Sequence, residues 1–314
     1  MSLRAIPLLV IAGPTSTGKT TVAIDLARRY GGELVGADSI QVYRGFDVGS
    51  AKPRPEDLDG IVHHLIDVAT PNNPLDAVEY ATLADAAIAD IHRRGKLPIV
   101  VGGTGLWLRA LLRGLIETPK VDPAIRSLLE QQAVVEGRSG LYARLQKVDP
   151  LAAERIHPND CVRIVRALEV YEQTGVPLGQ LREMHAKGAP RYRSFNVVLD
   201  LDRPTLHARI AQRTEAMLAG GWVDECRQIV RCYGPDTRPL GSVGYRQLLD
   251  HILRGEPLET TTRRIRKATL VYTRRQRTWF RGEPGFTWWA TPAELSEGAG
   301  CRKIDAYLDH RGML

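Results

Sequence analysis

A run of small and cationic residues near the start of the chain has the spacing of a phosphate-binding loop. It reads G-x-x-x-x-G-K-T, from Gly13, Pro14, Thr15, Ser16, Thr17 and Gly18 to Lys19 and Thr20. Glycines in this pattern turn backbone N–H groups toward an anion, the lysine neutralises the terminal phosphate, and the last hydroxyl binds Mg²⁺. An apolar run (6–12) precedes the loop and a helix-compatible run (22–29) follows it. We therefore predict that all eight residues bind a di- or triphosphate and that Thr20 is a ligand of Mg²⁺.

Two further reactive groups follow apolar runs. Asp38 comes directly after residues 33–37, and Thr104 lies in the glycine loop after residues 97–101. A carboxylate beside a bound phosphate suits a general base or an outer metal ligand, and a hydroxyl on a glycine loop suits hydrogen bonding to a phosphate or bridging oxygen. The alternatives are a capping or turn role for Asp38 and a plain strand-to-helix turn at Thr104. The nearby phosphate loop favours the chemical roles.

The run 97–101 lacks the acidic residue that holds Mg²⁺ in many nucleoside triphosphatases. Asp200 is a candidate for that role, although Asp200 and Asp202 equally suit the start of the next helix. Arg209 and Arg213 are four residues apart in a predicted helix and so share one face. They are expected either to close over a diphosphate or to be ordinary surface arginines.

These groups need a scaffold that positions them, and the hydrophobic pattern of the sequence predicts one. Apolar runs at 6–12, 33–37, 97–101 and 195–201 alternate with helical patterns at 77–94, 106–112 and 205–218. The pattern predicts an α/β fold like that of P-loop NTPases, with a parallel sheet, helices on both faces and ligands at the carboxyl ends of the strands. Between 121 and 193 only helical patterns occur. We expect a core domain of residues 1–120 and 194–314, and a helical insertion domain of residues 121–193.

Composition narrows the class of protein. The chain has 314 residues, 43% of them apolar, and carries no signal-peptide pattern, no membrane-length apolar run and no zinc-like cysteine spacing, so a cytoplasmic enzyme is expected. Its net charge is +7, and residues 261–281 contain eight basic and no acidic residues, interleaved with aromatic ones. Such a block suits a surface that binds a polyanion, with a solvated helix face as the alternative.

Several short motifs occur in a characteristic order along the chain. After the phosphate loop come Asp38-Ser39-x-Gln41-Val42-Tyr43, Ser50-Ala51-Lys52-Pro53, His64-Leu65-Ile66-Asp67, Gly102-Gly103-Thr104-Gly105-Leu106, His157-Pro158-Asn159-Asp160, Arg166-Ala167-Leu168-Glu169, Gly244-Tyr245-Arg246 and Tyr272-x-x-Arg275-Gln276-x-Thr278-Trp279-Phe280. Together they closely resemble the bacterial type of the tRNA dimethylallyltransferases, also called tRNA isopentenyltransferases. The resemblance covers residues 6–281.

The resemblance implies transfer of a dimethylallyl group from dimethylallyl diphosphate to N6 of the adenosine 3′ to the anticodon. It implies that Asp38 takes the N6 proton and that Thr104 bonds the oxygen of the breaking bond. Lys19, Thr20 and Arg213 are then expected to hold the diphosphate, with Mg²⁺ bridging its phosphates. Contacts with the tRNA anticodon stem-loop are expected at Asp38, Ser39, Ile40, Gln41, Thr104, Arg126, Val162, Arg163, Ile164, Val165, Arg166, Gly241, Ser242, Val243, Gly244, Tyr245, Arg246, Arg274 and Arg275.

The chain departs from the family pattern at positions outside the proposed base and phosphate loop. Ser50, Trp107 and Gln247 stand where Thr, Tyr and Glu are common, and Thr273-Arg274 replaces Ala-Lys. A monomer with no membrane partner is expected. Three alternatives are an adenylate isopentenyltransferase that uses free AMP, ADP or ATP, a small-molecule P-loop kinase, and a non-enzymatic RNA-binding module.

Overall fold

The chain divides into two compact units. The computed structural model describes residues 3–116, 118–120, 122–186, 188–296 and 299–310. One unit, the core unit, comprises Met1–Leu112 and Arg191–Leu314, and the other, the helical unit, comprises Arg113–Pro190. The predicted first residue of the insertion domain, 121, lies outside the described residues.

The core unit contains a six-stranded sheet in which every pair of neighbours is parallel, in the order β3-β2-β4-β1-β5-β6. The strands are β1 (Leu8–Ala12), β2 (Gly32–Gly36), β3 (His63–His64), β4 (Leu97–Gly102), β5 (Ser194–Leu199) and β6 (Trp288–Ala290). The predicted fold class is confirmed. The edge strand β6 was not predicted, because three residues are too few to show a hydrophobic period.

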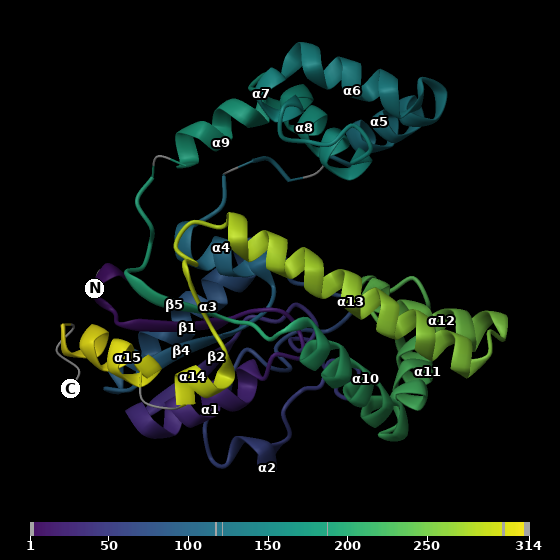
Figure 1. Ribbon diagram of the computed structural model, residues 1–314. Coiled ribbons are helices and arrows are strands. Elements are labelled where there is room, and N and C mark those ends of the chain that lie inside the picture. The colour runs from purple at the N-terminus through teal and green to yellow at the C-terminus, as the bar shows by residue number, and fades with distance from the viewer. Residues whose placement is uncertain (1–2, 117, 121, 187, 297–298, 311–314) are drawn as a thin grey trace. The chain divides into compact units, whose positions relative to one another are not determined.

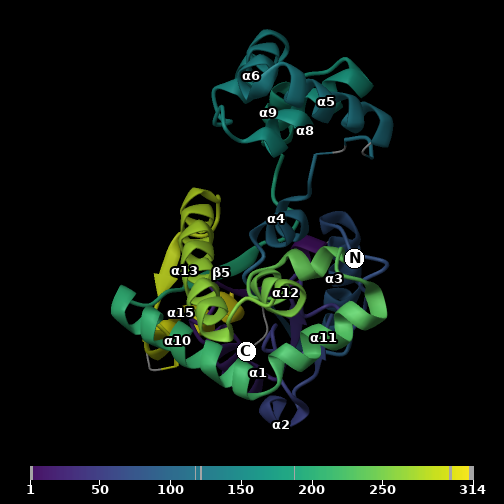
Figure 2. The ribbon, with the colours of Figure 1, turned by 90° about the vertical axis from the view of Figure 1, so that its right-hand side faces the viewer.

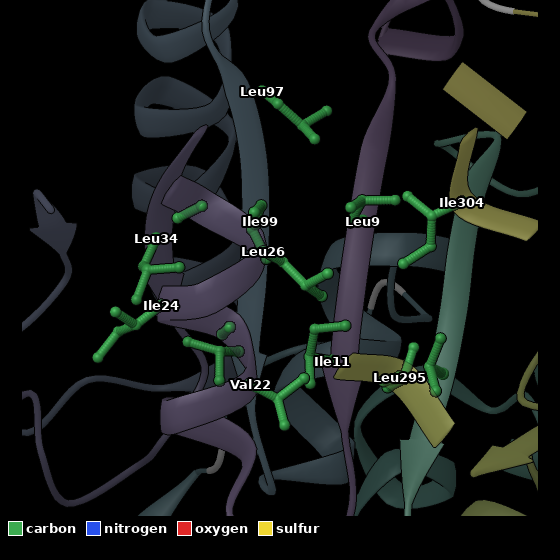
Figure 3. Packing of buried hydrophobic residues seen from close by; sticks show 14 of the residues in the cluster. Leu9, Ile11, Val22, Ile24, Leu26, Leu34, Leu97, Ile99, Leu295 and Ile304 are labelled. Carbon is green, nitrogen blue, oxygen red and sulfur yellow. The ribbon is translucent and has the colours of Figure 1, made fainter. Parts of the chain in front are cut away.

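Helices cover both faces of this sheet (Figure 1). Leu9 and Ile11 of β1 pack on α1 (Lys19–Tyr30), α14 (Pro292–Ser296) and α15 (Ala299–Asp309) in one buried cluster, which Figure 3 shows. Leu8 and Val10 are equally buried but lie outside that cluster, because alternate side chains of a strand point to opposite faces. On that opposite face α3 (Ala77–Arg93) packs against β2 and β4.

Four helices from the C-terminal half of the core unit form a group of their own, labelled in Figure 2. They are α10 (Arg203–Ala219), α11 (Trp222–Tyr233), α12 (Tyr245–Arg254) and α13 (Leu258–Gly282). Helix α13 packs on α10 and α12, and α11 packs on α10 and α12. The remaining short elements of the core unit are η1 (Leu3–Ala5), α2 (Pro55–Leu58), α4 (Gly105–Arg113) and η2 (Arg238–Gly241).

The helical unit is built around its own apolar cluster, which includes Leu129, Leu145 and Leu168. Its helices are α5 (Pro123–Val135), α6 (Gly137–Val148), α7 (Pro150–Ala153), α8 (Cys161–Thr174) and α9 (Leu178–Ala186). Asp122 caps α5 and Asp160 caps α8, each accepting at least one hydrogen bond from a backbone amide of the first turn.

Every helix that the structure describes is either too short or too polar to cross a lipid bilayer.

Candidate active site

The loop between β1 and α1 has a backbone shape that few residues adopt. Gly13 has φ +140°, and a Cβ there would lie 2.3 Å from the carbonyl oxygen of Leu199. Ser16 and Gly18 also have positive φ, at 65° and 87°. The loop is closed by a 2.9 Å hydrogen bond from the Thr17 hydroxyl to the carbonyl of Pro14. Positive φ at a non-glycine residue is typical of functional loops, and this one leads directly into the N-terminus of α1.

Cationic side chains converge on this loop. Lys19 Nζ donates to the carbonyl of Pro14 at 2.7 Å, and burial together with the nearby Arg213 lowers the pKa of Lys19 from 10.5 to about 7, against an opposing effect of Asp38. Burial also lowers the pKa of Arg213. The Arg209 guanidinium, one turn before Arg213 on α10, lies 3.3 Å from where a Cβ of Gly18 would be. Crowded cations around a phosphate loop indicate an anion site, and both arginines of α10 lie beside this loop, Arg209 as an exposed residue.

Two cavities adjoin at this point. The first, which we call the outer cavity, has a volume of about 560 Å³ and is lined by residues that include Lys19 and Thr20. The second, the inner cavity, has a volume of about 350 Å³ and is lined by residues that include Asp38. Ser16 and Arg213 line both cavities. A ligand held at the phosphate loop can therefore extend past these two residues toward the carboxylate.

Asp38 combines a structural bond with a free oxygen. Its Oδ1 accepts hydrogen bonds from the backbone amides of Ile40 at 2.9 Å and Gln41 at 3.4 Å. Its Oδ2 makes no hydrogen bond to any residue that the structure describes. Burial and the charge of Asp38 together raise the pKa of Tyr272, another residue of the inner cavity, to about 12. The turn role and the general-base role are thus compatible, because they use different oxygens.

Thr104 has the turn role that the sequence allowed, and its hydroxyl lies beside Ser39. Its carbonyl accepts from the backbone amides of Trp107 and Leu108 at the start of α4, which makes the loop a strand-to-helix turn. Its hydroxyl accepts from the backbone amide of Ser39 at 3.0 Å and lies 3.3 Å from the Ser39 hydroxyl. The side chain is therefore held next to Asp38 by the turn itself.

Gln276 was not predicted as a site residue. Its Oε1 accepts from the backbone amide of Thr15 at 3.0 Å, and its Nε2 donates to the carbonyl of Gly103 at 2.9 Å. A Cβ at Gly103 would lie 2.6 Å from that Nε2, so a glycine is needed for the approach of α13. Gln276 joins the phosphate loop to the loop that carries Thr104. Its only sequence signal was its place in the motif of α13.

Glu225 on α11 was missed as well. Its carboxylate accepts from three consecutive backbone amides, those of Asp47, Val48 and Gly49, at 2.8, 2.6 and 3.0 Å. It also accepts from the Tyr245 hydroxyl at 2.6 Å. One carboxylate thereby fixes two segments that line the inner cavity. No local pattern signals it, because all four partners are distant in the sequence.

The predicted tRNA contacts of the core unit fall into two groups. Ser39, Ile40, Gly241, Ser242, Val243 and Tyr245 line the inner cavity with Asp38. The other positions lie elsewhere: Gly244 packs on the ring of Trp222, Gln41 Nε2 donates to the carbonyls of Ser50 and Ala51, and Arg246 is exposed. The Tyr245 side chain is only 1% exposed, so it forms part of the cavity wall.

The basic block on α13 is partly neutralised within the protein. Ion pairs join Arg263 to Glu259, Arg264 to Asp250 and Glu256, Arg266 to Glu215, and Arg277 to Asp200. Arg274 and Arg275 are exposed and form no ion pair with the described residues. Lys267 and Arg281 of the same helix are likewise exposed and without an ion pair to the described residues, so all four cations are placed to bind a polyanion.

The helical unit holds the other predicted tRNA contacts. Arg126 and Arg166 both bind the fully buried carboxylate of Glu169. Within the run 162–166, Val162 and Arg163 are exposed, while the Ile164 and Val165 side chains are buried in the apolar cluster.

Comparison with known proteins decides the family. A family model described as IPP transferase matches residues 41–283. This chain belongs to the IPP transferase family. It is 50% identical over 289 residues to a tRNA dimethylallyltransferase of Anaeromyxobacter dehalogenans (92% of this chain, 94% of the relative), and 43% identical over 298 residues to tRNA dimethylallyltransferase 1 of Pelobacter propionicus (94% and 96%).

Solved structures support the assignment of this chain to the IPP transferase family. The full-length tRNA isopentenylpyrophosphate transferase of Bacillus halodurans superposes with a TM-score of 0.70 at 32% identity, covering 98% of each chain. A eukaryotic dimethylallyltransferase, solved in snapshots of its action on tRNA, gives a TM-score of 0.80 at 27% identity, covering 98% of this chain and 80% of that one.

The site of this IPP transferase has few protein ligands for a metal. Asp200 is paired with Arg277 at 2.6 Å, and Asp202 is the residue that opens α10. Among the described residues no three His, Cys, Asp or Glu side chains gather as a metal site. The Thr20 hydroxyl lines the outer cavity and makes no hydrogen bond within the described part of the chain. A single hydroxyl next to a phosphate site fits Mg²⁺, which keeps most of its waters and binds mainly through substrate phosphates.

Proposed function

We propose that the chain transfers the dimethylallyl group of dimethylallyl diphosphate to N6 of the adenosine 3′ to the anticodon in tRNA. The arrangement that carries the proposal is the junction of the two cavities at Ser16 and Arg213. It puts a phosphate loop on one side and a carboxylate with a free oxygen on the other. The names of the relatives, which specify tRNA as the molecule acted on, support the same reaction.

The residues fit the charges that this reaction develops. As the allylic C–O bond breaks, positive charge appears on the prenyl carbon and negative charge on the diphosphate oxygen. Lys19 and Arg213 then neutralise the departing diphosphate, and the Thr104 hydroxyl donates to the oxygen of the broken bond. The N6 nitrogen forms its bond to the prenyl carbon and gives its proton to Asp38 Oδ2. Each of these groups gains interaction as the bond breaks, which is the condition for catalysis.

The proposed reaction uses Mg²⁺, with Thr20 as its protein ligand. The ion, when bound, neutralises diphosphate oxygens and so makes the diphosphate a better leaving group. The Thr20 hydroxyl is the protein group that would hold it, beside the Lys19 ammonium.

The acceptor is expected to be RNA rather than a free nucleotide. Arg274 and Arg275 form an exposed cationic surface on α13, and such surfaces bind phosphodiester backbones. N6 of an adenosine is reached only when the base leaves its stack, which is inexpensive in a single-stranded anticodon loop. Because tRNA is the acceptor in this proposal, we place the enzyme in the cytoplasm.

A comparison of different acceptors tests the proposed function. The purified chain is incubated with dimethylallyl diphosphate and Mg²⁺, and with an anticodon stem-loop, AMP, ADP or ATP as acceptor. We expect prenylation of the stem-loop and no product with the free nucleotides. Prenylated AMP or ATP without prenylated RNA would instead indicate an adenylate isopentenyltransferase.

A further inference from the structure

The indole ring of Trp222 is fitted into the wall of the inner cavity by two glycines from different segments. Trp222 is 2% exposed and lines that cavity. A Cβ at Gly49 would lie 1.8 Å from the indole Nε1, and a Cβ at Gly244 would lie 2.1 Å from Cη2. Any larger residue at either position would displace the ring. The edge of the ring also meets Tyr245, with 5.6 Å between centroids and an interplanar angle of 84°.

Hydrogen bonds of helix α11 also hold the Trp222 ring in place. Trp222 is the first residue of α11, and Glu225, one turn later, binds the amides of Asp47, Val48 and Gly49 and the hydroxyl of Tyr245. The helix is therefore tied to both segments that enclose the ring. The wall at Trp222 is a fixed boundary of the cavity and not a movable side chain.

The cavity is lined by polar side chains where it meets the phosphate loop and includes apolar side chains elsewhere. Ser16 and Arg213 line it at its junction with the outer cavity, and Asp38 lines it as well. Met217, Ile265 and Trp222 contribute apolar surface. The indole N–H makes no hydrogen bond to the residues the structure describes and is buried. Trp222 thus contributes the shape and bulk of its ring to the cavity wall.

We propose that Trp222 sets the length of the prenyl chain that the enzyme accepts. This inference rests on the proposed function. With the diphosphate held at Lys19 and the reacting carbon near Asp38, the tail of the donor points into the apolar part of the inner cavity. A five-carbon tail ends at the indole, and a ten-carbon tail needs the space that the indole fills. Trp222 acts by steric exclusion, which is a common source of specificity.

Donor selectivity of Trp222 variants tests the inference. kcat/KM is measured for dimethylallyl diphosphate and for geranyl diphosphate with the same stem-loop, and the products are weighed by mass spectrometry. Trp222→Ala and Trp222→Leu are expected to raise the geranyl-to-dimethylallyl ratio by at least about tenfold. Trp222→Phe, which keeps most of the wall, is expected to keep the wild-type ratio. Trp288→Ala is the matched control, because Trp288 of β6 packs on Phe195 and does not line the inner cavity.

The outcomes separate the inference from the proposed function. Wild-type transfer of a five-carbon group to RNA tests the function, whereas the selectivity ratio tests Trp222. Calorimetric binding of the two diphosphates to Trp222→Leu and wild type gives a second readout that does not need transfer, and a relative gain for geranyl diphosphate supports the inference. Unchanged selectivity in both kinetics and binding for Trp222→Leu would overturn it. A raised KM for the stem-loop with an unchanged donor ratio would also overturn it, because the ring would then face the purine.

Discussion

The hydroxyl of Thr104 accepts a 3.0 Å hydrogen bond from the backbone amide of Ser39, which joins the loop after β4 to the loop after β2. Since Asp38 directly precedes Ser39, this bond fixes the hydroxyl beside the proposed base. Its proton is donated to the Ser39 hydroxyl at 3.3 Å, and in the proposed reaction it turns instead toward the diphosphate oxygen.

Removing this hydroxyl is expected to slow the chemical step. Thr104→Ala should lower kcat by about 10²-fold, as loss of one donor to a developing oxyanion does, with little change in stem-loop affinity. Thr104→Ser retains the hydroxyl and should stay within about tenfold of wild type. The two variants and the wild type are compared by their single-turnover rates at a saturating concentration of dimethylallyl diphosphate. A Thr104→Ala rate equal to that of wild type would restrict Thr104 to its role in the turn.

Asp38→Asn tests the general base while preserving the turn, because an amide oxygen accepts from Ile40 and Gln41 as Oδ1 does. We expect transfer to fall by about 10²-fold or more, since an amide cannot take the N6 proton. The affinity for the stem-loop, measured by fluorescence anisotropy, should remain close to that of wild type. Full activity of Asp38→Asn would exclude the carboxylate as the base.

The exposed arginines of α13 are expected to bind RNA phosphates. Arg274→Gln combined with Arg275→Gln should weaken stem-loop binding and reduce the slope of log K against log salt by about one for each phosphate that is no longer neutralised. Arg263→Gln is a matched control on the same helix, because Arg263 is already paired with Glu259. The double variant and the control are titrated over the same salt range. An unchanged slope in the double variant would make these arginines a solvated helix face.

Glu33 gives a prediction for acid stability. Its buried carboxylate binds Arg94, Lys96 and His64, and these partners hold the pKa of Glu33 well below its usual value of 4.5. Because the carboxylate binds a proton more readily when unfolded, its contribution is present above pH 4.5 and decreases as the pH falls below it. Glu33→Gln should lower the free energy of unfolding by about 3 kcal/mol at pH 7, with a smaller difference from wild type in acid.

Urea unfolding followed by tryptophan fluorescence measures this effect in the core unit alone. All five tryptophans of the chain lie in the sequence ranges of that unit. A difference between Glu33→Gln and wild type that stays constant from pH 7 to pH 4 would show that the charge of Glu33 does not carry the stabilisation.

The sequence predicted those parts of the site that are local in the chain. The phosphate loop, Asp38 and Thr104 each follow an apolar strand, and parallel strands bring their carboxyl ends to one edge. Glu225, Gln276 and Trp222 were not predicted, because their partners are tens to hundreds of residues away. Tertiary contacts of this kind leave no periodic or spacing signal in a single sequence.

The charge of the basic block shows the same limit of prediction from a single sequence. The block at 261–281 contains no acidic residue, yet several of its arginines are paired in the folded chain. Their partners Glu215, Asp250 and Asp200 come from α10, from α12 and from the loop after β5. A count of charges along the sequence therefore overestimated the free cationic surface, because within the described residues the fold leaves Lys267, Arg274, Arg275 and Arg281 as the exposed cations of the block with no ion pair.

The central claim is that the phosphate loop holds a departing diphosphate whose prenyl group passes to an adenine nitrogen. The most direct measurement quantifies released diphosphate together with the modified nucleoside after digestion of a stem-loop incubated with dimethylallyl diphosphate and Mg²⁺. We predict one diphosphate for each N6-dimethylallyl adenosine formed. Hydrolysis or transfer of the γ-phosphate of ATP, with no five-carbon addition to the RNA, would contradict the claim.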